Sequence, residues 1–306
     1  MAESCACQQC CWLHSRFNFV SLDCLWVTLV LDWAIGRQGI HDARRNLNSM
    51  DITMDFYLGT QNVHWLRIAQ IPLMVSHVRL RRRKSLPRAV SSWVLDSGGF
   101  SELSLHGEWT VKPQEYIEAV RRYRDEIGQM VWAAPQDWMC EPWMVEKTGL
   151  SIVEHQRRTT DNYLELAERA PDIPWIPVMQ GWSGDDYHRH AEDYSRAGID
   201  LTTQPTVGIG SVCRRQGTTE AATIIRSLWA TGIRNLHGFG FKTLGLREVG
   251  GMMASADSMA WSYNGRMSNP LPGCTHRRCT QCLLFALQWR DRVLSGIPNE
   301  FQAALV

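Results

Sequence analysis

The chain of 306 residues lacks the features that mark several large classes of protein. Its net charge is only +1, so no overall field favours a polyanionic partner. It has no internal repeat and no long low-complexity segment, which argues against repeat architectures. The apolar stretch 17–35 contains Asp23 and Asp32, whose charges are costly in a bilayer, and neither a basic segment nor a small-residue cleavage site flanks it. We therefore expect this stretch to be neither a transmembrane helix nor a signal peptide.

The 10 cysteines lack the even spread of a secreted disulfide framework. Five lie within the first 24 residues and three lie at 274–282, while Cys140 and Cys213 are isolated. This distribution is typical of a reduced, cytoplasmic protein that contains a metal site.

Residues 1–49 differ in composition from the rest of the chain. They are rich in Cys and Trp, show weak periodicity and end in a polar stretch at 44–49. We expect them to form an N-terminal extension that is either disordered or not part of the native protein, and we expect the working domain to occupy 50–306. A Cys-x-Cys-x-x-Cys arrangement at 5–10 is a second, weaker candidate for metal binding.

After Met50, short apolar runs alternate with amphipathic stretches. The runs lie near 56–58, 72–75, 92–95, 130–134, 175–179, 205–209, 235–239 and 254–257. Helical stripes are predicted at 114–127 after Pro113, at 153–169, at 185–197, and at 218–231, where Thr218 or Thr219 is the N-cap and Gly232 ends the helix. About eight strands alternating with helices predict an α/β fold, a (β/α)8 TIM-type barrel. A doubly wound sheet is the alternative, but no glycine-rich phosphate-binding motif follows the first strand.

Four polar residues each close one of these apolar runs: Asp96, Asp137, Gln180 and Asp257. Taken singly, each is compatible with an ordinary turn, cap or strand end. Parallel barrels, however, build their active sites from side chains at the carboxyl ends of several strands. Jointly the four residues therefore predict an enzyme active site, and three of them are carboxyls.

Two carboxyl groups in one site can divide a substitution reaction between them. One can attack an anomeric carbon and form a covalent glycosyl-enzyme intermediate, while the other moves the proton of the leaving and incoming groups. A third acidic group and a glutamine can hydrogen-bond the edge of a purine-like base. The residues therefore favour cleavage of a glycosidic or N-glycosidic bond.

The segment 274–282 carries four candidate metal ligands, Cys274, His276, Cys279 and Cys282. Three thiolates and one imidazole suit a tetrahedral structural zinc ion. Reduced thiols in a loop are one alternative. A redox pair at Cys279 and Cys282 is another, although it lacks the usual helix-start context.

Positive charge is clustered locally despite the neutral total. The clusters lie at 79–84, 121–124, 157–158, 214–215 and 277–278. Each alone is expected to be a solvated helix face, but together they favour a phosphate-rich substrate.

Several motifs, in order along the chain, resemble those of tRNA-guanine transglycosylases. They are Asp96-Ser97-Gly98-Gly99-Phe100, Gln180-Gly181, Gly208-Ile209-Gly210, Gly238-Phe239-Gly240, Asp257 and the closing cysteine cluster. The resemblance covers about 54–290, and the segments 96–109 and 255–263 are most similar to the DNA-directed branch, the deazapurine-in-DNA transglycosylases (DpdA). It implies an enzyme that exchanges guanine in DNA for a 7-deazaguanine such as preQ0, with a structural zinc ion and, by analogy, a homodimer.

The resemblance also implies roles for individual residues. Asp257 stands in the place of the nucleophile that attacks C1′, and Asp96 in that of the general acid/base for the incoming base. Asp137 and Gln180 occupy base-recognition positions. Backbone and side-chain contacts to the base are implied for Ser97, Gly98, Gly99, Phe100, Gly208, Ile209 and Gly210.

The cysteine cluster is where the chain departs from the family pattern. The usual order is Cys-x-Cys-x-x-Cys with a distant histidine, whereas here His276 takes the second position and no histidine follows Cys282. We expect Cys282 to supply the fourth ligand. The helix expected at 283–294 can still pack the cluster against the barrel.

Three competing functions stay open at this point. The same base exchange on tRNA is the nearest, since no feature of the sequence reads a 2′-hydroxyl. A carboxylate-pair glycoside hydrolase is the second, and it would have no need of the basic clusters. The third is a catalytically inert, zinc-containing nucleic-acid-binding protein. Trp138, Trp182 and Trp261 are candidates for stacking on a base, although core packing is the commoner use of Trp.

Overall fold

The structure is a computed structural model, and it describes residues 54–215 and 217–297. The expected extension at 1–49 and the cysteine arrangement at 5–10 lie outside the described residues. In the described part of the chain, no helix has the length and apolar character needed to span a bilayer.

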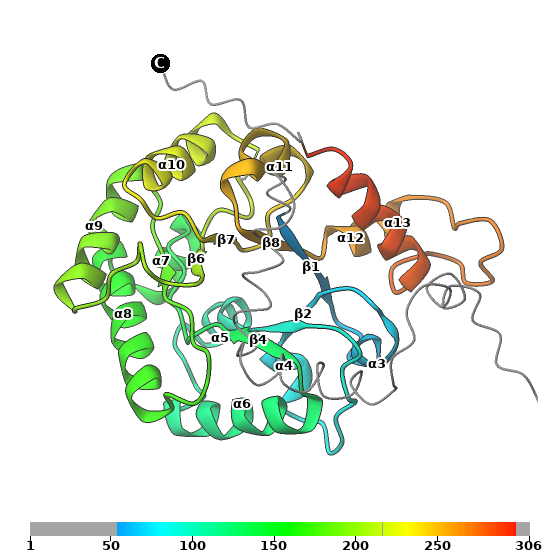
Figure 1. Cartoon of the computed structure of the whole chain (residues 1–306), viewed down its shortest axis with the longest axis horizontal. Coiled ribbons are helices and arrows are strands. Elements are labelled where there is room, and N and C mark those ends of the chain that lie inside the picture. Colours follow the sequence, from blue (N-terminus) through cyan, green and yellow to red (C-terminus); the bar gives the residue numbers. More distant parts are fainter. Residues whose placement is uncertain (1–53, 216, 298–306) are drawn as a thin grey trace, which may run out of the picture. The chain divides into compact units, whose positions relative to one another are not determined.

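Eight parallel strands form one curled sheet, in the order β4-β3-β2-β1-β8-β7-β6-β5 (Figure 1). Their bounds are β1 (Asp55–Thr60), β2 (Leu73–Ser76), β3 (Trp93–Asp96), β4 (Met130–Ala133), β5 (Val178–Met179), β6 (Val207–Ile209), β7 (Leu236–Gly238) and β8 (Ser255–Ser258). The α/β class and the eight predicted strands are therefore confirmed. The first and last strands pair side by side, with Tyr57 opposite Asp257.

The two end strands of the order, β4 and β5, approach each other through one isolated bridge. Ala133 pairs with Trp175 there, and its amide donates to the Pro174 carbonyl at 3.0 Å while its carbonyl accepts from the Ile176 amide at 3.2 Å. The contact lies just before β5, whose own ladder to β6 covers only Val178 and Met179.

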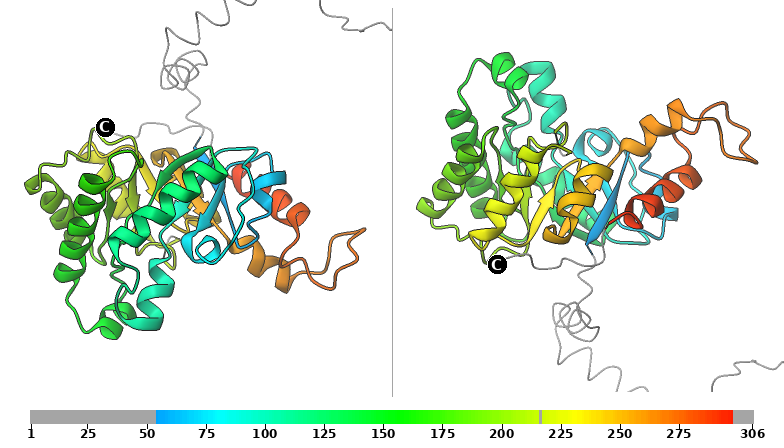
Figure 2. Two further views of the ribbon diagram at one scale, coloured as in Figure 1. Left: turned by 90° about the horizontal axis from the view of Figure 1, so that it is seen from below. Right: turned by 90° about the horizontal axis from the view of Figure 1, so that it is seen from above.

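The helices of the described residues are α3 (Trp65–Ile68), α4 (His77–Leu80), α5 (Gly99–His106), α6 (Pro113–Ile127), α7 (Pro142–Thr148), α8 (Ile152–Arg169), α9 (Gly184–Arg196), α10 (Thr219–Ala230), α11 (Thr243–Val249), the 3-10 turn η1 (Gly250–Met252), α12 (Ala260–Met267) and α13 (Leu283–Leu294). Of these, α6, α8, α9 and α10 lie around the outside of the curled sheet (Figures 1 and 2). The four helices predicted from amphipathic stripes are confirmed to within about two residues at each end.

Local capping chemistry explains where these helices begin. Pro113 opens α6, where a missing amide proton costs nothing. The Ser183 side chain accepts from the Asp186 amide and the Asp186 side chain accepts from the Ser183 amide, which forms a capping box at α9. Thr218, rather than Thr219, caps α10, and Gly232 follows that helix with a φ of +96°.

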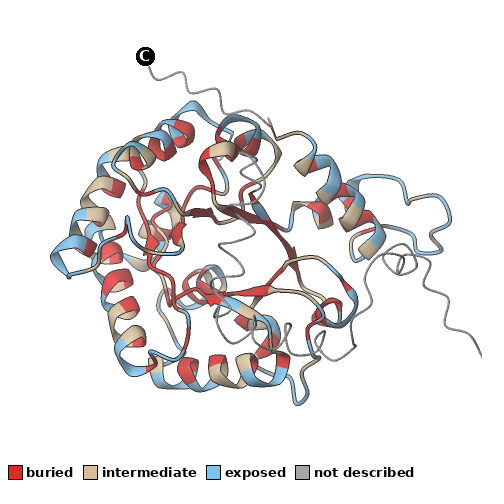
Figure 3. Ribbon diagram, in the orientation of Figure 1, coloured by how far each residue is buried: buried red, intermediate tan, exposed pale blue. Residues whose placement is uncertain are grey.

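Successive side chains of β1 point alternately to the two faces of the sheet. Phe56 packs against Trp289 of α13 at a ring-centroid distance of 6.1 Å, so Phe56 and Leu58 face the helices. Tyr57 points to the opposite, inner face, where it joins Trp132, Val94 and other strand side chains in a small second core. Figure 3 shows the strands buried and the outward helix faces exposed. The inner core leaves the carboxyl ends of the strands to carry polar side chains.

Candidate active site

The structure brings the four strand-end residues together at the carboxyl ends of the strands. Asp96 is the last residue of β3, and Asp257 is the third residue of β8, within the strand rather than after it. Asp137 and Gln180 follow β4 and β5 and are hydrogen-bonded to each other. Asp96 lies close enough to both Asp257 and Asp137 for the three charges to interact.

Asp257 is held by one of its two carboxylate oxygens. The Gly240 amide donates to Oδ1 at 2.8 Å, and Nε2 of His237 lies 3.5 Å from the same atom. The other ring nitrogen of His237 lies 2.8 Å from the Ser255 hydroxyl. Oδ2 has no hydrogen-bond partner among the described residues, so it is the oxygen available for attack on an electrophilic carbon.

His237 was not singled out from the sequence. It is fully buried on β7, and its ring packs against Trp132 and Phe239 with centroids 4.7 and 4.8 Å away. In the sequence it stands inside the apolar run before Gly238-Phe239-Gly240, where a histidine is indistinguishable from a core residue. Only the pairing of β7 with β8 places it beside Asp257.

Asp96 is a carboxyl that retains its proton more readily than usual. Burial raises its pKa, and the charge of Asp257 raises the pKa further, against hydrogen bonds from the Ser76 side chain and the Gly98 amide that lower it. Gly98 has a φ of +86°, and a Cβ there would lie 2.6 Å from a methyl group of Val78. The glycine therefore lets the chain turn tightly behind Asp96.

Asp137 is an acceptor at the centre of a polar network. The Ser97 hydroxyl donates to its Oδ1 at 3.0 Å, and the Gln180 amide nitrogen donates to its Oδ2 at 2.6 Å. Burial raises the pKa of Asp137 to about 6, with a further contribution from the charge of Asp96. Two buried carboxyls with raised pKa values in one site are typical of acid/base chemistry.

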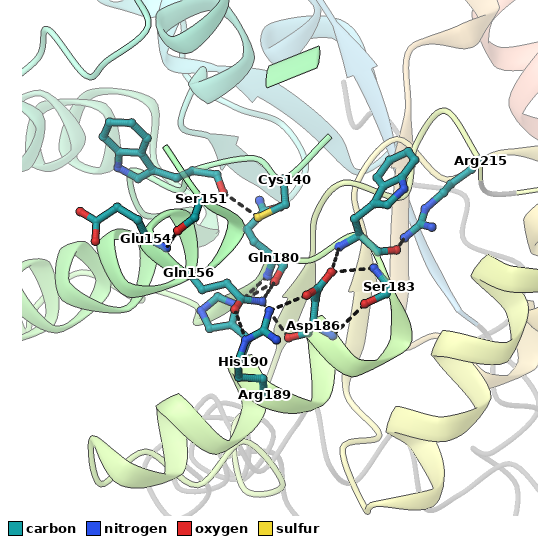
Figure 4. Close-up of polar contacts among 12 residues, drawn as sticks. Cys140, Ser151, Glu154, Gln156, Gln180, Ser183, Asp186, Arg189, His190 and Arg215 are labelled. Atoms are coloured by element: carbon teal, nitrogen blue, oxygen red, sulfur yellow. Dashed lines mark hydrogen bonds and ion pairs between the residues drawn. The ribbon is translucent and has the colours of Figure 1, made fainter. Parts of the chain in front are cut away.

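Buried side chains of α8 and α9 fix the backbone of Gln180 (Figure 4). The Gln156 side chain donates to the Gln180 carbonyl at 2.7 Å, and His190 Nδ1 accepts from the Gln180 amide at 2.8 Å. On the opposite side, a Cβ at Gly210 would collide with the Gln180 carboxamide, so only glycine leaves room for it. The position of this amide is therefore determined from two elements at once.

The remaining residues predicted to contact the base differ in which of their atoms can reach the site. Gly208 packs against Phe239, and a Cβ there would lie 2.6 Å from that ring. Ile209 directs its side chain into the core between sheet and helices, so it can present only backbone to the site. A Cβ at Gly99 would lie 3.2 Å from Asp137, so this glycine lies directly against that carboxyl. Phe100 is half exposed, 5.6 Å from the ring of Trp143.

The three tryptophan candidates for stacking on a base lie in different environments in the structure. Trp261 is buried in the outer core, donating to the Gly59 carbonyl at 2.8 Å, and it stacks near Trp65 rather than facing the site. Trp138 is also buried, in a small cluster with Leu103 and Met144. Trp182 is partly exposed beneath the guanidinium of Arg215 at 4.2 Å. Trp143, which the sequence did not single out, lies by Phe100 instead.

Some of the basic clusters prove to be paired on the protein itself. Arg121 and Arg124 both bind Asp172, and Arg157 and Arg158 both bind Glu154. These agree with solvated helix faces. By contrast, Arg214 is exposed, stacks against Trp143 and forms no ion pair among the described residues. The exposed run 82–84 and the exposed pair at 277–278 likewise form no ion pair among the described residues.

Cys274, His276, Cys279 and Cys282 gather in the loop between α12 and α13. All four ligand atoms lie within 4.8 Å of one another, a spacing compatible with a tetrahedral zinc ion, whose bonds to sulfur are about 2.3 Å. The Cys279 amide donates to the Gly265 carbonyl at 3.0 Å, and Cys282 precedes α13, which packs on β1. The five cysteines of the described region form no disulfide.

A comparison with protein families gives one match. The family model described as DpdA, DeoxyPurine in DNA protein A, matches residues 52–305. No curated protein matches the chain.

The raised pKa of Asp137 predicts a specific dependence of stability on pH. Between about pH 4 and pH 6 the folded protein binds a proton that the unfolded chain has lost, so the free energy of unfolding falls as pH rises through this window. Asp137→Asn should reduce that fall by on the order of 2 kcal/mol. The measurement is urea denaturation at several pH values, with the exposed Asp185→Asn as control. A fall of unchanged size in Asp137→Asn would contradict the assignment.

The ligand cluster predicts a metal-dependent melting temperature. Chelation, or Cys279→Ser, should lower Tm by on the order of 5–10 °C because the loop between α12 and α13 loses its cross-link. Elemental analysis and thermal unfolding provide the measurement, with Cys213→Ser as a control outside the cluster. Equal Tm values with and without chelator would rule out a structural metal.

Proposed function

This chain belongs to the DpdA, DeoxyPurine in DNA protein A, family, and on that premise we propose that it exchanges guanine in DNA for a 7-deazaguanine base through a covalent intermediate on Asp257. Membership implies a DNA-modifying transglycosylase. The finer assignment rests on one observation. Asp257 has a single oxygen free, and Asp96, a carboxyl with a raised pKa, lies within electrostatic reach of it.

The proposed reaction has two half-steps in which atoms and charges balance. Asp257 Oδ2 attacks C1′ of the target nucleotide, the bond from C1′ to the base nitrogen breaks, and the departing guanine takes a proton from Asp96. The incoming base then gives its ring N–H proton to Asp96, its nitrogen attacks C1′, and the ester to Asp257 breaks. The hydrogen bond from the Gly240 amide to Oδ1 limits the attack to one orientation of the carboxyl.

Base recognition is assigned to Asp137 and Gln180. An ionised Asp137 can accept from the N–H groups on the guanine edge, and the Gln180 amide nitrogen can donate to its carbonyl. Ser97 orients Asp137, while Gly98, Gly99 and the backbone of Gly208, Ile209 and Gly210 leave room for a flat ligand. Phe100, at the exposed rim, is placed to cover the bound base.

DNA is the proposed polymer, and its target nucleotide must leave the base stack to reach these carboxyls. Arg214, the run 82–84 and the pair at 277–278 are among the exposed basic residues that form no ion pair within the described residues, so they are free to contact phosphates. We further infer that the bridge between Ala133 and Trp175 closes the sheet into a (β/α)8 barrel and that the cysteine cluster holds a structural zinc ion. If bound there, zinc would tie the α12–α13 loop together and take no part in base exchange.

An exchange assay tests the proposed substrate directly. Purified protein incubated with labelled preQ0 should incorporate label into duplex DNA that contains guanine, and not into tRNA. Parallel reactions with the two polymers at equal guanine content provide the comparison. Label in tRNA alone would replace the DNA assignment with the tRNA one, and release of free sugar without exchange would favour a hydrolase.

Asp257→Asn tests the covalent step. An amide oxygen is a poor nucleophile, so exchange should fall by at least about 10³-fold and the denaturation-resistant protein–DNA adduct should disappear. Adduct formation is measured on denaturing gels, and folding by thermal unfolding. Asp185→Asn, on the outer helix α9, is the matched control. A folded Asp257→Asn protein with wild-type exchange would remove this residue from the reaction.

A further inference from the structure

Ser211 has an unusual backbone and an unusual position. It follows Gly210 at the end of β6, is buried, and has a φ of +56°, a region that residues with a side chain rarely adopt. Such strain persists only where surrounding contacts hold it, and it concentrates at functional sites. Here the backbone aims the hydroxyl at the side chain of Gln180.

The Ser211 hydroxyl has three polar neighbours. Its oxygen accepts from the Cys140 amide at 2.7 Å, lies 2.7 Å from Gln180 Oε1, and lies 3.0 Å from Glu141 Oε2. A serine hydroxyl carries one proton and two lone pairs, so it can donate to only one of the two side-chain oxygens, and Gln180 Oε1 at 2.7 Å is the nearer. The Cys140 amide donates to one lone pair, and the other is open to a proton from Glu141 when that carboxyl is neutral.

Glu141 can donate in this arrangement in its neutral form. Burial raises the pKa of Glu141, which favours the neutral acid, although Ser211, Arg214 and Arg215 oppose the shift. With both lone pairs of Ser211 occupied, its hydroxyl cannot accept a bond from the Gln180 amide. The carboxamide therefore turns its oxygen toward Ser211 and its nitrogen away.

The opposite end of the Gln180 side chain agrees with this orientation. The Gln180 nitrogen donates to Asp137 at 2.6 Å, and its second N–H has no acceptor among the described residues. Above about pH 6, where Asp137 is ionised, a flipped amide would set two oxygens against each other there. In that state Gln180 offers a donor, and not an acceptor, to a ligand held beside it.

We propose that Ser211, supported by Glu141 and the Cys140 amide, locks the Gln180 carboxamide as a donor and so makes the pocket select a base with a carbonyl group at that edge over a base with an amino group. The inference rests on the proposed function and adds to it a residue that determines specificity. Ser211 touches no reacting atom. It acts as a positioning residue through Gln180.

Two free bases provide the test, guanine and 2,6-diaminopurine, which share the 2-amino group and differ at ring positions 1 and 6. Asp137 meets position 1 in every variant, so a change in the affinity ratio reports on Gln180. Wild-type protein should bind guanine more tightly. Ser211→Ala and Ser211→Gly should lower the guanine preference by about tenfold or more. Ser211→Gly also relieves the positive φ, so loss of folding cannot explain its effect.

Companion variants establish the route of action. In a Gln180→Ala background, Ser211→Gly should leave the ratio unchanged, because the residue that Ser211 positions is gone. Glu141→Gln, a neutral donor, should keep the ratio within about threefold, whereas Glu141→Ala should lower it. Ser227→Ala, a partly buried serine on α10, is the control and should match wild type.

The outcomes separate this inference from the function on which it rests. Wild-type protein that binds neither base in calorimetry would overturn the proposed function and the inference with it. Wild-type protein that prefers guanine, together with Ser211 variants that keep the full preference, would overturn the inference alone. Equal weakening of both bases in Ser211→Gly would also overturn it, since Ser211 would then contribute affinity without selection.

Discussion

The parallel pairing of β1 with β8 is the interaction on which the rest of the structure depends. It joins strands about 200 residues apart in the chain and sets Tyr57 opposite Asp257. Because all eight strands run the same way, every carboxyl end lies at one edge of the sheet. That single constraint collects Asp96, Asp137, Gln180 and Asp257 into one site, and α13 packs against the outer face of β1 through Trp289 and Phe56.

Three carboxyl groups lie close together at that edge, where ionising all of them at once is electrostatically unfavourable. Asp257 receives one hydrogen bond, from the Gly240 amide, and lies 3.5 Å from a ring nitrogen of His237. Burial raises the pKa values of Asp96 and Asp137 despite the hydrogen bonds that each accepts. Environment rather than residue type therefore sets the pKa values of these two buried carboxyls.

Sequence reasoning found the residues whose motifs have fixed spacing and missed those whose roles depend on neighbours. Asp96-Ser97-Gly98-Gly99-Phe100 and the cysteine cluster are local patterns, and the structure does bring their members together. His237, Glu141 and Ser211 stand in unremarkable surroundings in the sequence. Trp261, a candidate for stacking on a base, lies in the outer core instead, since helix α12 turns it toward Gly59.

The sequence by itself determined the eight strands, the main helices and their caps, because hydrophobic period and capping chemistry act over a few residues. It also determined which polar residues close the strands. Only the tertiary structure decided which oxygen of Asp257 is free, which way the Gln180 carboxamide faces, and which arginines are already paired with acidic residues. Those properties depend on contacts between residues dozens to hundreds of positions apart. They are fixed by strand register and by how a limited number of protons is shared among buried groups.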